Sequence, residues 1–248
     1  MPQTSLYTPA PYAHLPDEIR TLATAFDSHI AKVLDDDSAH DLSHLRRVTL
    51  TALRIGDVEH ANPRVLVAAA YLHDIVNLPK HHPDRHLASS MSAARAYEFL
   101  ATNFRQFSTE ERSEIAHAIE AHSFSAGIKP RTIEAKILQD ADRLDALGAI
   151  GIARVFYIAG KLGQALFHGA DPLAMNRLLD DKAYAVDHFR VKLLKLHETM
   201  NTDSGRAIAR QNSEYLVGFL AKLVSECQGD MTNSDAQATE FLKMGDAA

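Results

Sequence analysis

Histidine and aspartate residues occur in this chain at spacings that would let them share one divalent metal ion. The candidates are His44, the adjacent pair His73-Asp74, and Asp142. Imidazole nitrogens and carboxylate oxygens without a thiolate suit manganese, iron, cobalt, nickel or magnesium better than a structural zinc site, although zinc is also compatible with such donors. The residue types therefore predict a site for a divalent metal.

The pair His73-Asp74 follows an almost wholly apolar segment, residues 65–72. A helix that is apolar on all sides lies in the centre of a fold. An ionised aspartate at the buried end of such a helix is costly unless it is paired or bound to a metal. The pair is therefore either a buried, hydrogen-bonded His–Asp pair or part of a metal site.

His44 has a competitor in His40, four residues earlier. Residues at this spacing face the same side of a helix. His40-Asp41 is itself a His-Asp pair, but it falls in the first helical turn, where Asp41 has a capping role. His44 lies one turn deeper, and His40 is then either close to the substrate or an exposed residue at the helix start.

Asp142 competes with two neighbouring carboxylates, Asp140 and Asp145. Asp140 lies four residues after Lys136, a spacing that fits a surface ion pair. Asp142 lies beside an apolar stripe and can therefore point inward.

Helix signals are frequent along the chain and strand signals are rare, which predicts an all-α fold. Asn62-Pro63 reads as a cap and first helical residue, and Ser108 with Glu111 forms a capping box. The expected helices span residues 16–34, 38–58, 63–74, 87–104, 108–121, 132–162 (with a break near Gly148 or Gly151), 181–200 and 203–226.

Three segments together resemble the HD superfamily of metal-dependent phosphohydrolases. They are residues 40–48 (HDLSHLRRV), 71–77 (YLHDIVN) and 137–151 (ILQDADRLDALGAIG), and the resemblance extends from about 37 to 210. It implies a single-domain helical bundle with a metal site in its centre. We expect that domain over 16–227, an N-terminal extension over 1–15, and a flexible tail over 228–248.

The resemblance implies roles for individual residues. The metal ligands would be His44, His73, Asp74 and Asp142, with Asp74 also taking part in proton transfer. Asp145 would orient a ligand histidine. Phosphate oxygens call for cationic donors, and the expected substrate contacts are Lys80, Arg85, His122, His40 and Arg143. For Arg143 the alternative is a partner in a salt bridge.

Two-metal phosphodiesterases of the superfamily hold a second ion with extra histidines between the His-Asp pair and the last aspartate. His117 and His122 occupy that part of this chain. The fuller histidine set of those enzymes is not evident, so His122 is expected to line the site and His117 to lie at the surface.

Composition limits the function classes. With 248 residues, 46% hydrophobic and 23% charged, the chain is long enough for one large domain. A net charge of -6 argues against a nucleic-acid polymer as partner. One cysteine, no secretory signal pattern and no long apolar run favour a cytoplasmic protein without a membrane span.

Three functions remain open at this point. The resemblance favours a phosphohydrolase that uses a metal-activated water on a small phosphorylated substrate, in most members a nucleotide. The alternatives are a two-metal cyclic nucleotide or dinucleotide phosphodiesterase, and a non-catalytic nucleotide-sensing module. Helical proteins of this superfamily often associate, so a homodimer is compatible with the resemblance.

Overall fold

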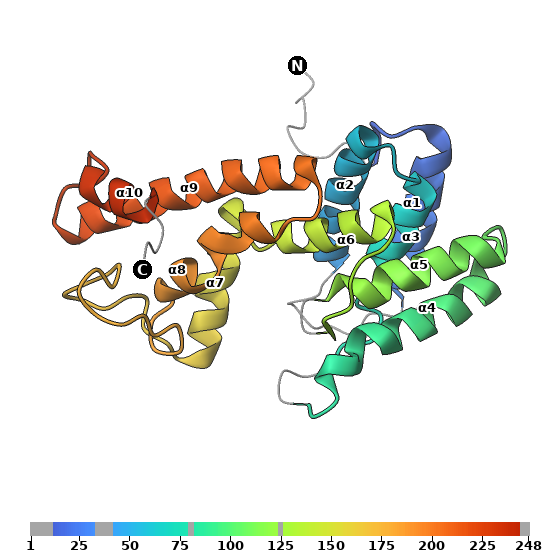
Figure 1. Ribbon diagram of the computed structural model, residues 1–248, viewed down its shortest axis with the longest axis horizontal. Helices are drawn as coiled ribbons and strands as arrows, with labels where there is room; N and C mark the ends of the chain where they lie inside the picture. Colours follow the sequence, from blue (N-terminus) through green and yellow to red (C-terminus); the bar gives the residue numbers. More distant parts are fainter. Residues whose placement is uncertain (1–11, 33–41, 79–81, 124–125, 244–248) are drawn as a thin grey trace, which may run out of the picture. The chain divides into compact units, whose positions relative to one another are not determined.

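The computed structural model describes residues 12–32, 42–78, 82–123 and 126–243 (Figure 1). In these ranges the regular elements are helices, and one isolated β-bridge joins Ala165 to Tyr184. The predicted all-α fold is therefore confirmed. The chain groups into two compact units, one ending at Asp142 and one beginning at Arg143. The domain bounds expected from the sequence stay a prediction.

The first unit is built around one buried helix. Its elements are α1 (Asp17–Ile30), α2 (Leu42–Glu59), α3 (Pro63–Leu72), η1 (Arg85–Leu87), α4 (Ala88–Asn103), α5 (Thr109–His122) and most of α6 (Ile133–Leu144). Every residue from Val65 to Leu72 is buried, and α3 contacts α1, α2, α4 and α5. The apolar segment therefore occupies the core, as its composition predicted, and its last turn delivers His73 to the interior.

Two predicted helix starts are confirmed by their caps. The Asn62 side chain accepts a hydrogen bond from the Arg64 amide at 3.0 Å, with Pro63 as the first helical residue. Ser108 and Glu111 form a reciprocal capping box, with distances of 2.8 and 3.1 Å. The expected start of α2 at residue 38 lies outside the described residues.

Aromatic side chains fill the space between α1, α3 and the end of α4. The rings of Phe26 and Phe104 are stacked with centroids 4.1 Å apart, and Phe26 also stacks on Tyr71 at 5.8 Å. In Figure 1, α4 and α5 run side by side, and these two helices make extensive contact. This packing holds the C-terminal end of α5 in place, where His122 is the last helical residue.

The second unit contains α7 (Gly148–Leu162), α8 (Asp187–Val191), η3 (Leu193–Thr199), α9 (Asp203–Cys227) and α10 (Ala236–Lys243). The break expected in the segment 132–162 falls just before Gly148, which has a φ of +65°. A side chain is strained at this φ, and a Cβ atom would lie 2.5 Å from Oδ1 of Asn212. Gly148 therefore allows the chain to leave α6 and start α7.

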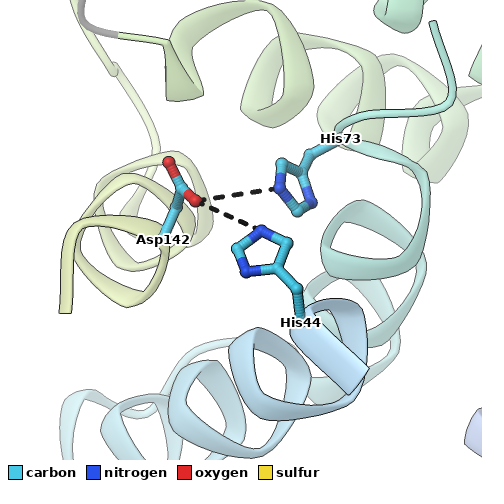
Figure 2. Close-up of side chains that lie close together, drawn as sticks. All are labelled: His44, His73 and Asp142. Carbon is cyan, nitrogen blue, oxygen red and sulfur yellow. Dashed lines mark ion pairs between the residues drawn. The ribbon is translucent and has the colours of Figure 1, made fainter. Parts of the chain in front are cut away.

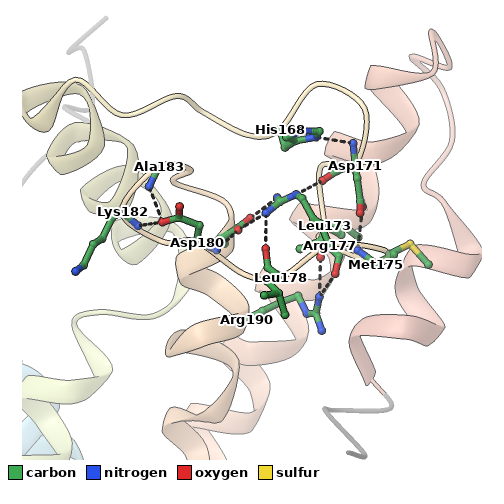
Figure 3. Close-up of polar contacts among 12 residues, drawn as sticks. His168, Asp171, Leu173, Met175, Arg177, Leu178, Asp180, Lys182, Ala183 and Arg190 are labelled. Carbon is green, nitrogen blue, oxygen red and sulfur yellow. Dashed lines mark hydrogen bonds and ion pairs between the residues drawn. The ribbon is translucent and has the colours of Figure 1, made fainter.

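The helix expected over 181–200 is only partly present. Helix α8 begins at Asp187, and the preceding residues belong to an irregular segment held by polar contacts (Figure 3). Arg177 donates to both carboxylate oxygens of the fully buried Asp187, at 2.6 and 2.7 Å, and Arg190 donates to the carbonyl oxygens of Leu173 and Ala174. These hydrogen bonds hold the segment before Asp187 in an irregular conformation. The spacing of apolar residues along the sequence does not reveal such bonds.

The expectation of a flexible tail is wrong for its middle part, because residues 236–243 form α10 against α9. Asp235 accepts a hydrogen bond from the Ala238 amide at 2.7 Å and so caps the helix start. Ala238 and Leu242 are buried, and the Arg190 guanidinium lies over the Phe241 ring. A few apolar residues at helical spacing suffice here, although the surrounding sequence is polar. Among the described helices, none combines the length and apolar character needed to cross a bilayer.

Candidate metal centre

Five side chains of types that can bind a metal come together inside the first unit. His44 lies in the first turn of α2, His73 and Asp74 directly follow α3, His122 ends α5, and Asp142 lies in α6. Four of these are the predicted ligands, and His122 was predicted to line the site. The structure therefore brings together residues from four helices that are far apart in the sequence.

The distances define two overlapping groups of three. In Figure 2, Asp142 Oδ1 faces two imidazoles, at 3.5 Å from Nε2 of His44 and 3.9 Å from Nε2 of His73. On Asp74, Oδ2 lies 3.5 Å from Nε2 of His73 and Oδ1 lies 3.6 Å from Nε2 of His122. Within each group the ligand atoms lie within 4.8 Å of one another, and His73 belongs to both groups.

Backbone carbonyls set the orientation of two of the imidazoles. Nδ1 of His73 lies 2.8 Å from the Ala70 oxygen, and Nδ1 of His122 lies 2.6 Å from the Ile119 oxygen. A carbonyl only accepts hydrogen bonds, so Nδ1 carries the proton in each ring. The lone pair of a neutral ring is then on Nε2, the atom that faces the cluster, which is the arrangement found in metal-ligating histidines.

The pKa values of the two histidines are shifted in opposite directions. His73 is fully buried, and burial lowers its pKa, with the neighbouring carboxylates only partly offsetting the effect. Burial also lowers the pKa of His122, but its hydrogen bond to Asp74 and the charge of that carboxylate outweigh burial and raise the pKa overall. His73 is therefore held in the neutral form that binds metals.

The donor set fits a divalent metal. Nε2 of His73 is buried and has no hydrogen-bond partner among the residues that the structure describes. A buried polar atom without a partner is costly, and a metal ion between the imidazoles and carboxylates would satisfy it. The two imidazoles and two carboxylates predicted as ligands offer nitrogen and oxygen atoms suited to several first-row divalent ions and to magnesium.

Three other residues predicted for the site are His40, Lys80 and Arg85. Lys80 and His40 lie outside the described residues. Arg85 is the first residue of η1, and its guanidinium donates a hydrogen bond to the Leu78 carbonyl oxygen. The contribution of these cations to substrate binding stays a prediction.

Arg143 and Asp145 belong to the second unit and have partners there. The Arg143 guanidinium donates to the Thr199 carbonyl oxygen, and the Asp145 carboxylate forms an ion pair with Arg154 at 2.5 Å. Their expected roles, as a substrate contact and as a support for a ligand histidine, stay predictions.

One expectation about α6 is wrong. Asp140 is fully buried, which contradicts the surface position that its spacing from Lys136 suggested. Spacing of four residues shows that two side chains share a helix face, but not whether that face meets solvent.

Gln139 is a supporting residue that the sequence reasoning missed. It is buried, and its Nε2 donates to the Ala121 carbonyl oxygen at 2.8 Å, which joins α6 to the last turn of α5. Its position next to the apolar residues Ile137 and Leu138 was the available signal, because a buried amide needs a partner. Outside the cluster, His117 accepts a hydrogen bond from the Arg131 amide at 3.0 Å.

This chain is similar to several known proteins. A family model described as HD domain matches residues 41–147. YpgQ of Bacillus subtilis strain 168 is 34% identical over 199 residues, which cover 79% of this chain and 88% of YpgQ. The crystal structure of YpgQ in complex with ADP has a TM-score of 0.63 at 31% identity, covering 84% of this chain and 96% of YpgQ.

A second similar structure is that of a hydrolase. An HD-superfamily hydrolase from Bacillus thuringiensis is 31% identical with a TM-score of 0.64, over 86% of this chain and 97% of that protein. The identity and coverage are both high enough to establish membership. This chain therefore belongs to the HD superfamily.

Proposed function

We propose that this protein is a metal-dependent phosphohydrolase that cleaves a phosphate ester or anhydride bond of a nucleotide. The observation that carries the proposal is the cluster of His44, His73, Asp74, His122 and Asp142. Two further findings support it: the HD-superfamily relative described as a hydrolase, and the relative whose structure contains ADP.

His44, His73, Asp74 and Asp142 would hold the ion. A divalent metal in such a site supplies a nucleophilic hydroxide near neutral pH and polarises a phosphoryl oxygen. The partly exposed carboxylates of Asp74 and Asp142 lie on the side accessible to solvent, whereas His44 and His73 are buried. A water and a substrate oxygen would therefore approach from the side of the carboxylates.

Asp74 and His122 would act together beside the reacting phosphorus. One oxygen of Asp74 faces His73 and the other faces His122, so the carboxylate can serve as a ligand and hold the second imidazole in place. With a proton on Nε2 as well as on Nδ1, that imidazole would be a cation and would neutralise charge that develops on the phosphoryl group in the transition state. Arg85, Lys80, His40 and Arg143 are proposed as further contacts for the phosphate groups.

The two-metal phosphodiesterase is the weaker alternative. Both groups of three depend on Nε2 of His73, and one imidazole nitrogen has one lone pair to give. If two ions were bound, only one of them could be coordinated by His73, and the other would have two of its three ligands. The shared histidine therefore favours one ion per chain.

The test is product release from a panel of nucleoside mono-, di- and triphosphates and cyclic nucleotides. Metal-stripped protein would be resupplied with manganese, cobalt, nickel, magnesium or zinc, and phosphate and pyrophosphate would be measured separately. Asp74→Ala is the test variant. His117→Ala is the matched control, because this histidine lies on the same helix as His122 and its ring accepts a bond from Arg131.

The expected result is metal-dependent turnover that Asp74→Ala abolishes and His117→Ala retains. The product then identifies the bond, and hydrolysis of cyclic nucleotides alone would favour the phosphodiesterase. Metal and nucleotide binding without turnover of any substrate in the panel would contradict the proposal and favour the sensing module.

A further inference from the structure

A partly buried polar network joins α1, α2 and α3, and its members lie two residues from His44 and from His73 without including either of them. Asp27 of α1 accepts two hydrogen bonds from Arg46 of α2, from Nε at 2.7 Å and from Nη2 at 2.6 Å. Oδ1 of Asp27 also accepts from the hydroxyl of Tyr71 in α3, at 2.9 Å. The Tyr71 hydroxyl in turn contacts the hydroxyl of Tyr12. One carboxylate therefore ties three helices and the segment before α1 together.

The sequence positions of its partners relate this network to the site. Arg46 comes two residues after His44, and Tyr71 comes two residues before His73. Two residues along an α-helix correspond to a rotation of about 200°. The side chains that bond to Asp27 therefore leave α2 and α3 on nearly the opposite side from the two ligand histidines.

Bonds on the far side of a helix fix its rotation about its own axis. Both imidazoles must present Nε2 to the same point, and His44 and His73 have their ring centroids 5.4 Å apart. A small rotation of either helix would move an Nε2 atom by a distance that matters for ligation. Asp27 is the one residue of the network that bonds to both helices.

The network is partly buried, and its central bonds have a defined geometry. The side chains of Asp27 and Arg46 are 18% and 37% exposed, whereas Tyr71 and Tyr12 are buried. Planar guanidinium and carboxylate groups that form two parallel bonds have a defined relative orientation. Loss of the carboxylate charge would leave Arg46 without its partner and Tyr71 with a weaker acceptor.

We propose that Asp27 is a positioning residue for the metal centre, which sets the rotation of α2 and α3 so that His44 and His73 share one ion. The inference rests on the proposed function only in requiring that these histidines bind a metal. Helix α1 carries no predicted ligand, but through Asp27 it would raise the affinity of the site for the metal.

The test measures binding of cobalt(II) alone to the full-length protein, without a nucleotide. Asp27→Asn removes the charge at constant size, and Tyr71→Phe removes one hydroxyl while keeping the ring that stacks on Phe26. The readouts are the dissociation constant, the visible absorption spectrum of bound cobalt, which reports its coordination, and unfolding by denaturant.

Arg64→Gln is the matched control. Arg64 also joins three elements of this unit, through bonds to Glu18 of α1 and Glu111 of α5 at 2.9 and 3.2 Å. It lies nine residues before His73, or roughly 13 Å along the helix axis at the usual rise per residue. It therefore reports what the loss of a comparable network does to stability at a distance from the ligands.

We expect Asp27→Asn to weaken cobalt binding about tenfold, the lower end of the effect typical of supporting residues, and to alter the spectrum. Tyr71→Phe should do the same to a smaller extent, and it keeps the test decisive if Asp27→Asn does not fold. Arg64→Gln should lower stability while leaving affinity and spectrum at wild-type values.

Three results would overturn the inference: wild-type affinity and spectrum in both test variants, an equal loss of affinity in Arg64→Gln, or no cobalt binding by the wild-type protein. Cobalt binding that shows the expected pattern, in a protein that hydrolyses no nucleotide, would instead overturn the proposed function and leave the role of Asp27 intact.

Discussion

Nε2 of His44 lies 3.5 Å from Oδ1 of Asp142, although the two residues come from α2 and α6 and are separated by α3, α4 and α5. The same oxygen lies 3.9 Å from Nε2 of His73. Asp142 is therefore the carboxylate that faces both predicted ligand histidines, and its charge is the one most directly balanced by an ion placed between them.

Asp142→Asn should lower metal affinity more than the roughly 10- to 100-fold that loss of a supporting residue causes, because it removes a ligand charge. The measurement is competition of manganese(II) against a fluorescent chelator. Asp145→Asn is the comparison, since Asp145 pairs with Arg154 in the second unit. Equal losses in the two variants would show that Asp142 is not a ligand.

The metal content should be one ion per chain. His73 is common to both groups of potential ligands, and a single Nε2 atom cannot complete two sites. Elemental analysis of protein dialysed against manganese would measure the ratio. A value of two per chain, reduced to one by His122→Ala, would contradict this prediction and support a two-metal centre.

Ser108→Ala should lower the free energy of unfolding by about 1 kcal/mol, the usual effect of losing an N-cap. The change removes the side-chain acceptor for the Glu111 amide at the start of α5. Denaturant unfolding of the two proteins would measure the difference. Ser113→Ala is the control, because that hydroxyl bonds only to the Thr109 carbonyl oxygen within the same exposed helix turn, and we expect little change there.

Arg177→Met should destabilise the second unit by about 3–5 kcal/mol, because it leaves the charge of a fully buried aspartate, Asp187, without its partner. Arg206→Met removes a similar bond to Asp203, whose side chain is 97% exposed, and should cost less than about 1 kcal/mol. Thermal unfolding of both variants would compare them. Similar melting temperatures would show that the Arg177 pair adds no more than a surface pair.

Protonation of Asp27 at low pH should lower the stability of the first unit. Burial alone would raise the pKa of Asp27, but hydrogen bonds from Arg46 and Tyr71 outweigh it and hold the pKa below its usual value of 3.8. A carboxyl with a lowered pKa in the folded state contributes stability above pH 3.8 and loses it as pH falls through the folded pKa.

Denaturant unfolding between pH 6 and pH 2 would test this prediction. The wild-type protein should lose more stability over the acid part of this range than Asp27→Asn, so the two curves should converge as pH falls. Parallel curves would mean that Asp27 has the same pKa in the folded and unfolded chains.

The helical character of this protein and a candidate set of metal ligands could both be predicted from the sequence. The apolar segment ahead of His73-Asp74 required a central helix, and the caps at Asn62 and Ser108 marked where two helices begin. These features are local, because capping and periodicity depend on residues a few positions apart. The order of histidines and aspartates, through its resemblance to a known superfamily, supplied the predicted ligand set, and the structure brings those residues together.

Only the tertiary structure decided how the supporting residues are arranged. The bonds from Gln139 to Ala121 and from Asp27 to Arg46 and Tyr71 join different helices, and their partners cannot be deduced from spacing along one element. The same reason explains the errors about the C-terminal tail and about Asp140, since burial depends on which helix packs against a given face. Helix starts follow from neighbouring residues, whereas the position of Asp142 between His44 and His73 depends on the packing of the helices that carry them.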